Sequence, residues 1–133
     1  AFRASAIVGL AFDERLPLYA WLEDSDFGGQ VGRRGLTVRA ETLRGVHCGN
    51  KTGRERGIRV GYSQIVNPTY LMRKGTLSPR FLATLMAKNM TANIVKSLAP
   101  EPFCDRRGRL RGNLLAIADV LRGRIEPERT ASL

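Results

Sequence analysis

The sequence has few cysteines and few aromatic residues, and it has no long apolar run. Its two cysteines, Cys48 and Cys104, lie far apart and neither belongs to a CxxC pair. They argue neither for a zinc site nor for a disulfide framework, and they fit a reducing cytosol. No apolar run reaches about 18 residues, so no bilayer-spanning segment is expected. The first residue is Ala1 rather than Met, and patterned sequence follows at once. We therefore expect the chain to be part of a longer protein.

Acidic residues are also scarce and are unevenly distributed. The 133 residues include 12 Asp and Glu against 22 Lys and Arg, a net charge of +10. Residues 1–26 hold five of the acidic residues but only two basic ones, so the remainder holds 20 basic and 7 acidic residues, a balance of +13. An acidic centre with a basic flank predicts an anionic ligand, a metal-bridged phosphate or a bilayer surface as partner.

The densest acidic group is the segment Trp21-Leu22-Glu23-Asp24-Ser25-Asp26-Phe27, which we call the acidic cluster. Its three carboxylates repel one another, and the aromatic neighbours make ionisation less favourable. The repulsion between the carboxylates would be offset by a metal ion, by a helix N-terminus or by a proton that the site moves. Two interpretations are open: an acidic helix start, in which Asp or Ser caps the first turn, and a chemical site.

The N-terminal third is expected to contain short elements of both kinds. Residues 1–12 are typical of the end of a strand, a short helix capped by Ser5 and a turn. A second short helix is expected from Asp26 to before Gly35. Residues 43–48 are expected to be an edge segment that carries His47. Alternating apolar residues between these two elements predict a half-buried strand: Leu36, Val38 and Ala40.

Residues 49–61 are rich in glycine and cations. Such a segment can bring backbone N–H groups and Lys or Arg side chains onto phosphates. It lacks the spacing of a Walker loop or of GxGxxG. A solvated flexible loop is therefore an equally open interpretation.

Longer amphipathic helices are expected in the second half. Asn67-Pro68 is typical of a helix start and Gly75 of its end. Ser78-Pro79 is expected to begin a second helix of about five turns, which stops before Pro100. A third is expected from about Leu110 to Arg122. Cations on the polar faces leave a membrane-surface role open: Arg73, Lys74, Arg80, Lys88 and Lys96.

Three features occur in an informative order: Phe12-Asp13-Glu14-Arg15-Leu16, then the acidic cluster, then the lone His47. This order resembles the C-terminal half of the catalytic domain of family 2 glycosyltransferases, inverting enzymes with the GT-A fold. In that family an FDE-like loop precedes an ED or EDxD motif at the head of a helix, and a histidine often follows. The resemblance covers about residues 1–50. A softer similarity to the ends of some bacterial members lies in Gly61-Tyr62-Ser63-Gln64, Asn67-Pro68, Arg73-Lys74-Gly75 and Asp105-Arg106-Arg107-Gly108-Arg109.

The resemblance implies an α/β chain, namely a partial GT-A-like domain whose short mixed sheet is followed by amphipathic C-terminal helices. Residues 1–61 would form the acceptor-side half of the catalytic domain, and residues 62–133 a helical extension. The family's nucleotide-binding half, with its DxD metal motif, would lie upstream. We therefore expect these residues alone to bind a nucleotide sugar weakly and to show little or no turnover.

The resemblance also assigns roles within the acidic cluster. Asp24 would be the general base that removes the proton of the acceptor hydroxyl as it attacks the anomeric carbon, and neighbouring carboxylates would raise its proton affinity. Glu23 would adjust the electrostatic field at Asp24 or orient the acceptor. Trp21 would stack on a sugar ring or line the acceptor pocket, and a place in the apolar core is the alternative. Asp26 would either contact the acceptor or cap the helix.

A second group would bind the departing diphosphate. His47 would contact the diphosphate or a divalent cation, Mg²⁺ or Mn²⁺, although a structural hydrogen-bonding role is equally open. Lys51, Arg54 and Arg56 would neutralise the diphosphate. The implied partners are a nucleotide-sugar donor and a saccharide or lipid-linked acceptor. The implied location is the cytoplasm, with peripheral binding to the inner face of the membrane.

The basic composition supports an alternative function, a small binding module for nucleic acid or an anionic membrane surface. No helix-turn-helix, zinc-finger or RNP-type motif is present, and aromatic residues are not interleaved with the basic runs. We therefore expect no specific nucleic-acid partner.

Overall fold

The computed structural model describes residues 2–16, 21–46, 55–99 and 101–133, and in this part of the chain the regular elements are all helical. A single-residue bridge between Glu101 and Cys104 is the only β-type pairing there. The elements in chain order are α1 (Ala4–Ile7), α2 (Glu23–Gly32), α3 (Gly57–Lys74), α4 (Pro79–Lys96), α5 (Arg106–Leu121) and the 3-10 helix η1 (Pro127–Ser132).

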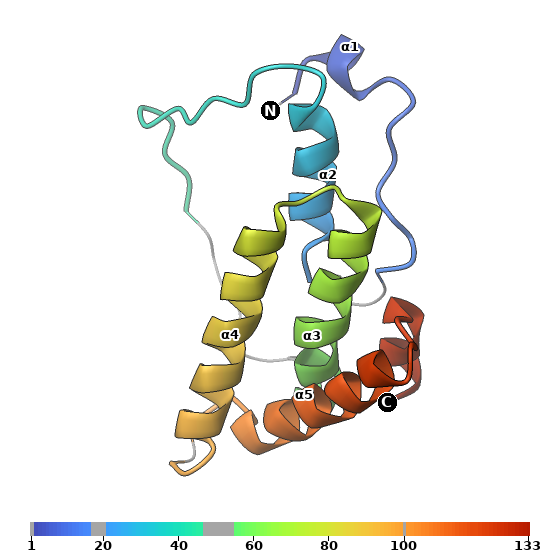
Figure 1. The fold of residues 1–133 in the computed structure, drawn as a ribbon. Coiled ribbons are helices and arrows are strands. Elements are labelled where there is room, and N and C mark those ends of the chain that lie inside the picture. The colour runs from blue at the N-terminus through green and yellow to red at the C-terminus, as the bar shows by residue number, and fades with distance from the viewer. Residues whose placement is uncertain (1, 17–20, 47–54, 100) are drawn as a thin grey trace.

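The helices form a small bundle in which α3 is central (Figure 1). α3 and α4 run side by side in opposite directions, and α5 crosses them at the end where α3 begins. α2 lies beside the opposite end of α3, and its Gly29 approaches the backbone of Thr76 in the turn between α3 and α4. None of the described helices is both long and apolar enough to cross a membrane.

The crossing of α3 and α5 depends on glycine. A Cβ atom on Gly61 would overlap the carbonyl oxygen of Arg109, and one on Gly112 would overlap that of Ile58. At these positions the two backbones therefore touch without intervening side chains. This explains why part of the glycine-rich segment is helical: the missing side chains permit the helices to approach each other, and packing outweighs the low helix propensity of glycine.

Two apolar clusters form the core. The first joins the loop before α2 to α3 and α4, and it comprises Leu16, Leu22, Leu71 and Leu82. The second joins α3 to α5, and it comprises Tyr62, Ile65, Val66 and Ala116.

A buried amide network joins α3, α4 and α5. The Nδ2 atom of Asn93 donates to Gln64 Oε1 and to Asn113 Oδ1, both at 2.8 Å. Asn113 Nδ2 in turn donates to the carbonyl oxygen of Gly61 at 2.7 Å. Because buried polar groups are costly when unpaired, this network favours one register of the three helices.

The C-terminal segment is held by an acidic residue of α5. Tyr62 donates its hydroxyl to Asp119 Oδ2 at 3.0 Å, and Arg129 of η1 forms an ion pair with the same carboxylate. Burial and the hydrogen bond to Asp119 raise the pKa of Tyr62 to about 12. The tyrosine is therefore neutral across the physiological range.

The expected α/β fold with a short mixed GT-A-like sheet is wrong for the described residues, which contain helices and no strand. Leu36 and Val38 of the expected strand are 97% and 79% exposed. Alternation specifies the two faces of a strand, but a strand also needs a neighbour to pair with, and none is present in the described segments.

The expected helix boundaries were partly correct. Gly75 ends α3 in a left-handed conformation (φ +73°), and Ser78-Pro79 begins α4, both as expected. Asn67-Pro68 as a helix start is wrong, because Pro68 lies buried inside α3. α5 begins four residues before the expected Leu110, since the Asp105 side chain accepts the Gly108 N–H at 2.7 Å and caps the helix.

The first two helices also differ from expectation. α1 begins at Ala4 and shows no side-chain cap. α2 begins at Glu23, so all three carboxylates of the acidic cluster lie in its first turn. The residue before it, Leu22, has φ +85°, and no side chain caps this end, so Asp26 is not a cap. α3 runs continuously through residues 61 and 62, where the sequence placed a domain boundary; that boundary stays a prediction.

Candidate functional site

Three segments singled out in the sequence meet at Lys74, the last residue of α3. Its Nζ atom lies 2.6 Å from Asp13 Oδ2 and 2.7 Å from Asp26 Oδ2. The hydroxyl of Tyr70 donates to Asp13 Oδ2 at 2.7 Å. The FDE-like loop, the acidic cluster and the Arg73-Lys74-Gly75 segment are thus parts of one ionic cluster.

Asp26 is the buried carboxylate of this cluster. It has no exposed surface, and its Oδ2 atom accepts from Gln30 Nε2 at 2.9 Å as well as from Lys74. Its Oδ1 atom accepts from the hydroxyl of Thr76. Both oxygens are therefore occupied by donors of the chain itself, which gives Asp26 a structural role in the described residues.

The contacts within this cluster shift the pKa values of Asp13, Lys74 and Tyr70. Burial acts to raise the pKa of Asp13, but hydrogen bonds from Lys74 and Tyr70 outweigh it and hold this pKa below its usual value. Burial acts to lower the pKa of Lys74, but the bonds to Asp13 and Asp26 outweigh it and raise this pKa. Burial and the bond to Asp13 raise the pKa of Tyr70.

Asp24 has different surroundings from Asp26, although only one residue separates them. Asp24 is exposed, and its Oδ1 atom accepts from the backbone N–H of Ser25 at 2.6 Å and from the Ser25 hydroxyl at 3.3 Å. Within the described segments its Oδ2 atom has no hydrogen-bond partner. Of the two aspartates, Asp24 is the one that a second molecule can reach.

The other residues predicted for the acceptor side lie next to Asp24 in the chain. Glu23 is partly buried in the first turn of α2. Trp21 is partly buried, packs against the first apolar cluster, and accepts a hydrogen bond from Asn67 Nδ2 to its carbonyl oxygen at 2.9 Å. Contact of either residue with an acceptor stays a prediction.

The predicted diphosphate group is described in part. His47, Lys51 and Arg54 lie outside the described residues. Arg56 is exposed immediately before α3, and no described hydrogen bond or ion pair joins it to the acidic cluster. The described residues therefore leave its role at a diphosphate untested.

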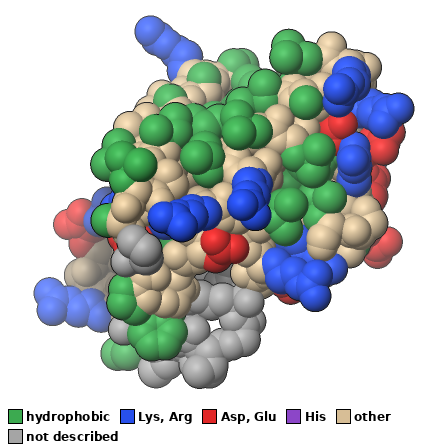
Figure 2. Space-filling view, turned by 90° about the horizontal axis from the view of Figure 1, so that it is seen from below, with side chains coloured by type: hydrophobic (Ala, Val, Ile, Leu, Met, Phe, Trp, Pro, Cys, Tyr) green, Lys and Arg blue, Asp and Glu red, His purple; other side chains and the backbone are tan. Residues whose placement is uncertain are grey.

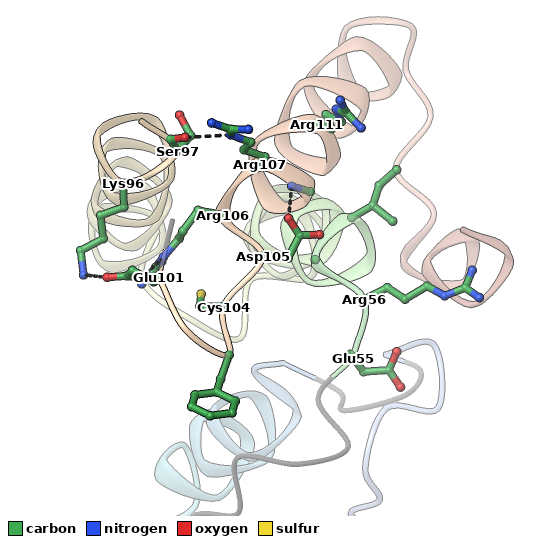
Figure 3. Close-up of a pocket in the computed structure, with 14 residues that line it drawn as sticks. Glu55, Arg56, Lys96, Ser97, Glu101, Cys104, Asp105, Arg106, Arg107 and Arg111 are labelled. Atoms are coloured by element: carbon green, nitrogen blue, oxygen red, sulfur yellow. Dashed lines mark hydrogen bonds and ion pairs between the residues drawn. The ribbon is translucent and has the colours of Figure 1, made fainter. Parts of the chain in front are cut away.

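Sequence reasoning missed a cation-lined cavity at the other end of α3 (Figure 3). This cavity has a volume of about 810 Å³ and is open to solvent. It lies where the N-terminal ends of α3 and α5 meet the C-terminal end of α4. The run Asp105-Arg106-Arg107-Gly108-Arg109 was noted in the sequence, but its position beside α3 depends on the glycine crossing. The lining cations are Arg56, Lys96, Arg106, Arg107 and Arg111.

The described residues do not fit the divalent cation that the resemblance implied. No group of three His, Cys, Asp or Glu side chains suited to a metal ion occurs among them. Although Asp24-Ser25-Asp26 spells a DxD sequence, both oxygens of Asp26 are occupied by Gln30, Lys74 and Thr76. A carboxylate so occupied offers no free oxygen to a hard cation.

Comparison of the chain with models of protein families, with curated proteins and with solved structures found no match. The family assignment therefore stays a prediction.

Proposed function

We propose that this chain is the acceptor-side part of an inverting glycosyltransferase and that Asp24 is its general base. The observation that supports this proposal is the division of roles within the acidic cluster. Asp26 is buried and neutralised by Lys74, whereas Asp24 is exposed with one carboxylate oxygen free within the described segments. A general base must reach the proton that it removes, and of these two aspartates only Asp24 has that access.

The proposed reaction uses a nucleotide-sugar donor. The acceptor oxygen attacks the anomeric carbon and forms the new glycosidic bond while the bond from that carbon to the diphosphate breaks. Asp24 takes the hydroxyl proton, and the nucleoside diphosphate leaves with the electron pair of the broken bond. Glu23 and Trp21 would orient the acceptor from either side of Leu22. Because the described residues do not fit a divalent cation, we assign no step to one.

The acceptor class and the location rest on the resemblance alone. It supports a saccharide or lipid-linked acceptor and a reaction in the cytoplasm, with the protein bound at the inner face of the membrane.

The test is made on the complete reading frame that encodes this chain, because the resemblance places the donor-binding part upstream of residue 1. The purified protein is incubated with a panel of UDP-, GDP- and dTDP-sugars together with a mixed acceptor extract, and released nucleoside diphosphate is measured. We expect Asp24→Asn to lower turnover by about 10²–10⁴-fold, the usual contribution of a general base. The unfolding midpoint should stay unchanged, since Asp24 is exposed.

Glu126→Gln is the matched control, because Glu126 is an exposed carboxylate outside the motifs of the resemblance and has no described side-chain hydrogen bond or ion pair. It should retain full turnover. Retained transfer in Asp24→Asn would reject the base assignment. The absence of transfer from every donor in the wild-type protein would count against a glycosyltransferase.

A further inference from the structure

Two arginines that border the cavity at the start of α5 form no ion pair within the described residues. Arg107 and Arg111 lie four residues apart on α5, and therefore on the same face, where like charges repel. The Nε atom of Arg107 donates only to the neutral carbonyl oxygen of Ser97, at 3.1 Å. Arg111 is exposed and has no hydrogen bond or ion pair within the described part of the chain.

The carboxylates around the cavity are already used by other groups. Glu101 forms ion pairs with Lys96 at 2.5 Å and with Arg106 at 2.6 Å, and these two cations lower its pKa to about 2. The Asp105 side chain caps α5 through its Oδ1 atom, and its Oδ2 atom lies against Gly57 at the start of α3. Glu55 pairs with Arg59, which is outside the cavity lining, at 3.4 Å. Five cations and three carboxylates line the cavity, so positive charge exceeds negative charge there by two.

The beginning of α3 borders the same space, and the Asp105 Oδ2 atom lies against Gly57 there. Gly57 and Ile58 line the cavity, no acidic residue lies in the first turn of α3, and no side chain among the described residues caps this helix end. The first N–H groups of a helix have no partner within the helix and carry partial positive charge. Figure 3 shows α5 and the end of α4 around this helix end, whereas the Arg56 side chain extends to the side away from α4. Arg56 therefore forms the far rim.

We propose that this cavity binds a phosphate-bearing anion, held mainly by the guanidinium groups of Arg107 and Arg111. Guanidinium groups bind phosphate oxygens in pairs, and an anion here would relieve the repulsion between the two arginines. The volume of about 810 Å³ lies within the range of small-molecule sites. This site is independent of the proposed sugar transfer, because it uses neither Asp24 nor any other residue of the acidic cluster.

The phosphate could belong to a soluble phosphate ester or to a lipid headgroup, since both present the same oxygens. The surroundings are compatible with both sources. Figure 2 shows Lys and Arg side chains among exposed hydrophobic ones on the face that lies at the bottom of Figure 1. Leu98, close to the cavity in sequence, is 84% exposed, and Phe103, which lines it, is 64% exposed. The experiment therefore has two arms.

The first arm measures binding of inorganic pyrophosphate by calorimetry at about 0.15 M salt. The second measures co-sedimentation with phosphatidylcholine vesicles that contain phosphatidylglycerol, against vesicles of phosphatidylcholine alone. Both arms compare wild type with the double variant Arg107→Gln/Arg111→Gln and with the single variant Arg111→Gln. The control is Arg122→Gln/Arg124→Gln, which removes the same charge from two exposed arginines without described side-chain partners beyond the end of α5.

We expect the cavity double variant to weaken binding of at least one probe by about tenfold or more, and the control variant to change it by less than about threefold. Loss in the pyrophosphate arm identifies a soluble phosphate ester, and loss in the vesicle arm alone identifies a headgroup. Arg111→Gln should show part of the loss with an unchanged unfolding midpoint, because this side chain makes no described contact that folding needs. Failure of wild type to bind either probe, or equal loss in both double variants, would overturn the proposal.

Discussion

Lys74 Nζ lies 2.7 Å from Asp26 Oδ2, although the two residues are 48 positions apart in the chain. The Asp26 side chain is fully buried, whereas that of Lys74 is 25% exposed. Lys74 also binds Asp13, 61 positions before it. One lysine at the end of α3 therefore fixes both the N-terminal loop and the first turn of α2, and with them the position of Asp24.

Substitution of Lys74 should destabilise the whole fold. Lys74→Met would leave the buried Asp26 carboxylate without its cation, and removal of one partner of a buried pair typically costs about 3–5 kcal/mol in the free energy of unfolding. Urea unfolding followed by circular dichroism measures this loss. Lys88→Met, at an exposed lysine of α4 without a described partner, is the control and should change stability by less than about 0.5 kcal/mol. Equal stability of the two variants would contradict the ionic cluster.

The crossing of α3 and α5 should not tolerate a single added methyl group. In Gly61→Ala the new Cβ atom would overlap the backbone carbonyl of Arg109, which cannot move without shifting α5. Overpacking of this kind costs about 1–3 kcal/mol or more. Thermal unfolding of Gly61→Ala measures the loss.

Gly28→Ala provides the matched control for the crossing. Gly28 lies inside α2, and apart from its chain neighbours and the backbone of its own helix, no atom of the described residues stands within 4 Å of the position where its Cβ would be. Alanine is a better helix former than glycine by about 1 kcal/mol, so this variant should be more stable than wild type. A Gly61→Ala variant as stable as Gly28→Ala would show that the helices cross at a greater distance.

Glu101 should contribute to the acid sensitivity of the protein. Its bonds to Lys96 and Arg106 lower its pKa from 4.5 to about 2, so the unfolded chain binds a proton there more readily than the folded one. Its contribution to stability is therefore present above about pH 4.5 and is lost as the pH falls to about 2. Glu101→Gln should be less stable than wild type at pH 7 and should show a shallower fall over that interval.

Urea midpoints measured from pH 2 to pH 7 check this dependence. Glu14→Gln serves as the control, since Glu14 is exposed and has no described partner. Its midpoints should follow those of wild type. An unchanged acid slope in Glu101→Gln would mean that the two cations do not hold this carboxylate in solution.

Helix ends were predictable where local chemistry sets them. Gly75 ends α3 because a left-handed residue suits glycine, and Pro79 begins α4 because a first-turn residue needs no N–H donor. The same local rule predicted a helix start at Asn67-Pro68, and that prediction was wrong because α3 continues through Pro68. Its burial in the bundle compensates for the missing backbone hydrogen bond.

The prediction of a sheet was wrong for a different reason. Alternation at Leu36, Val38 and Ala40 is a local property, whereas strand formation depends on a neighbour elsewhere in the chain. Within the candidate site, the sequence located the acidic cluster and the FDE-like loop. It did not distinguish Asp24 from Asp26, because burial depends on Lys74 and Thr76, which lie about 50 positions away.

The sequence by itself determined the charge balance, the existence of helices α4 and α5, the end of α3 and the acidic residues that a site would use. Each of these depends on residues within a few positions of one another. Only the tertiary structure decided that Gly61 and Gly112 form a helix crossing, that Lys74 neutralises Asp26, and that Arg107 and Arg111 face a cavity beside α3. These relationships join distant segments, and the free energy that selects them comes from packing and charge neutralisation in the folded chain.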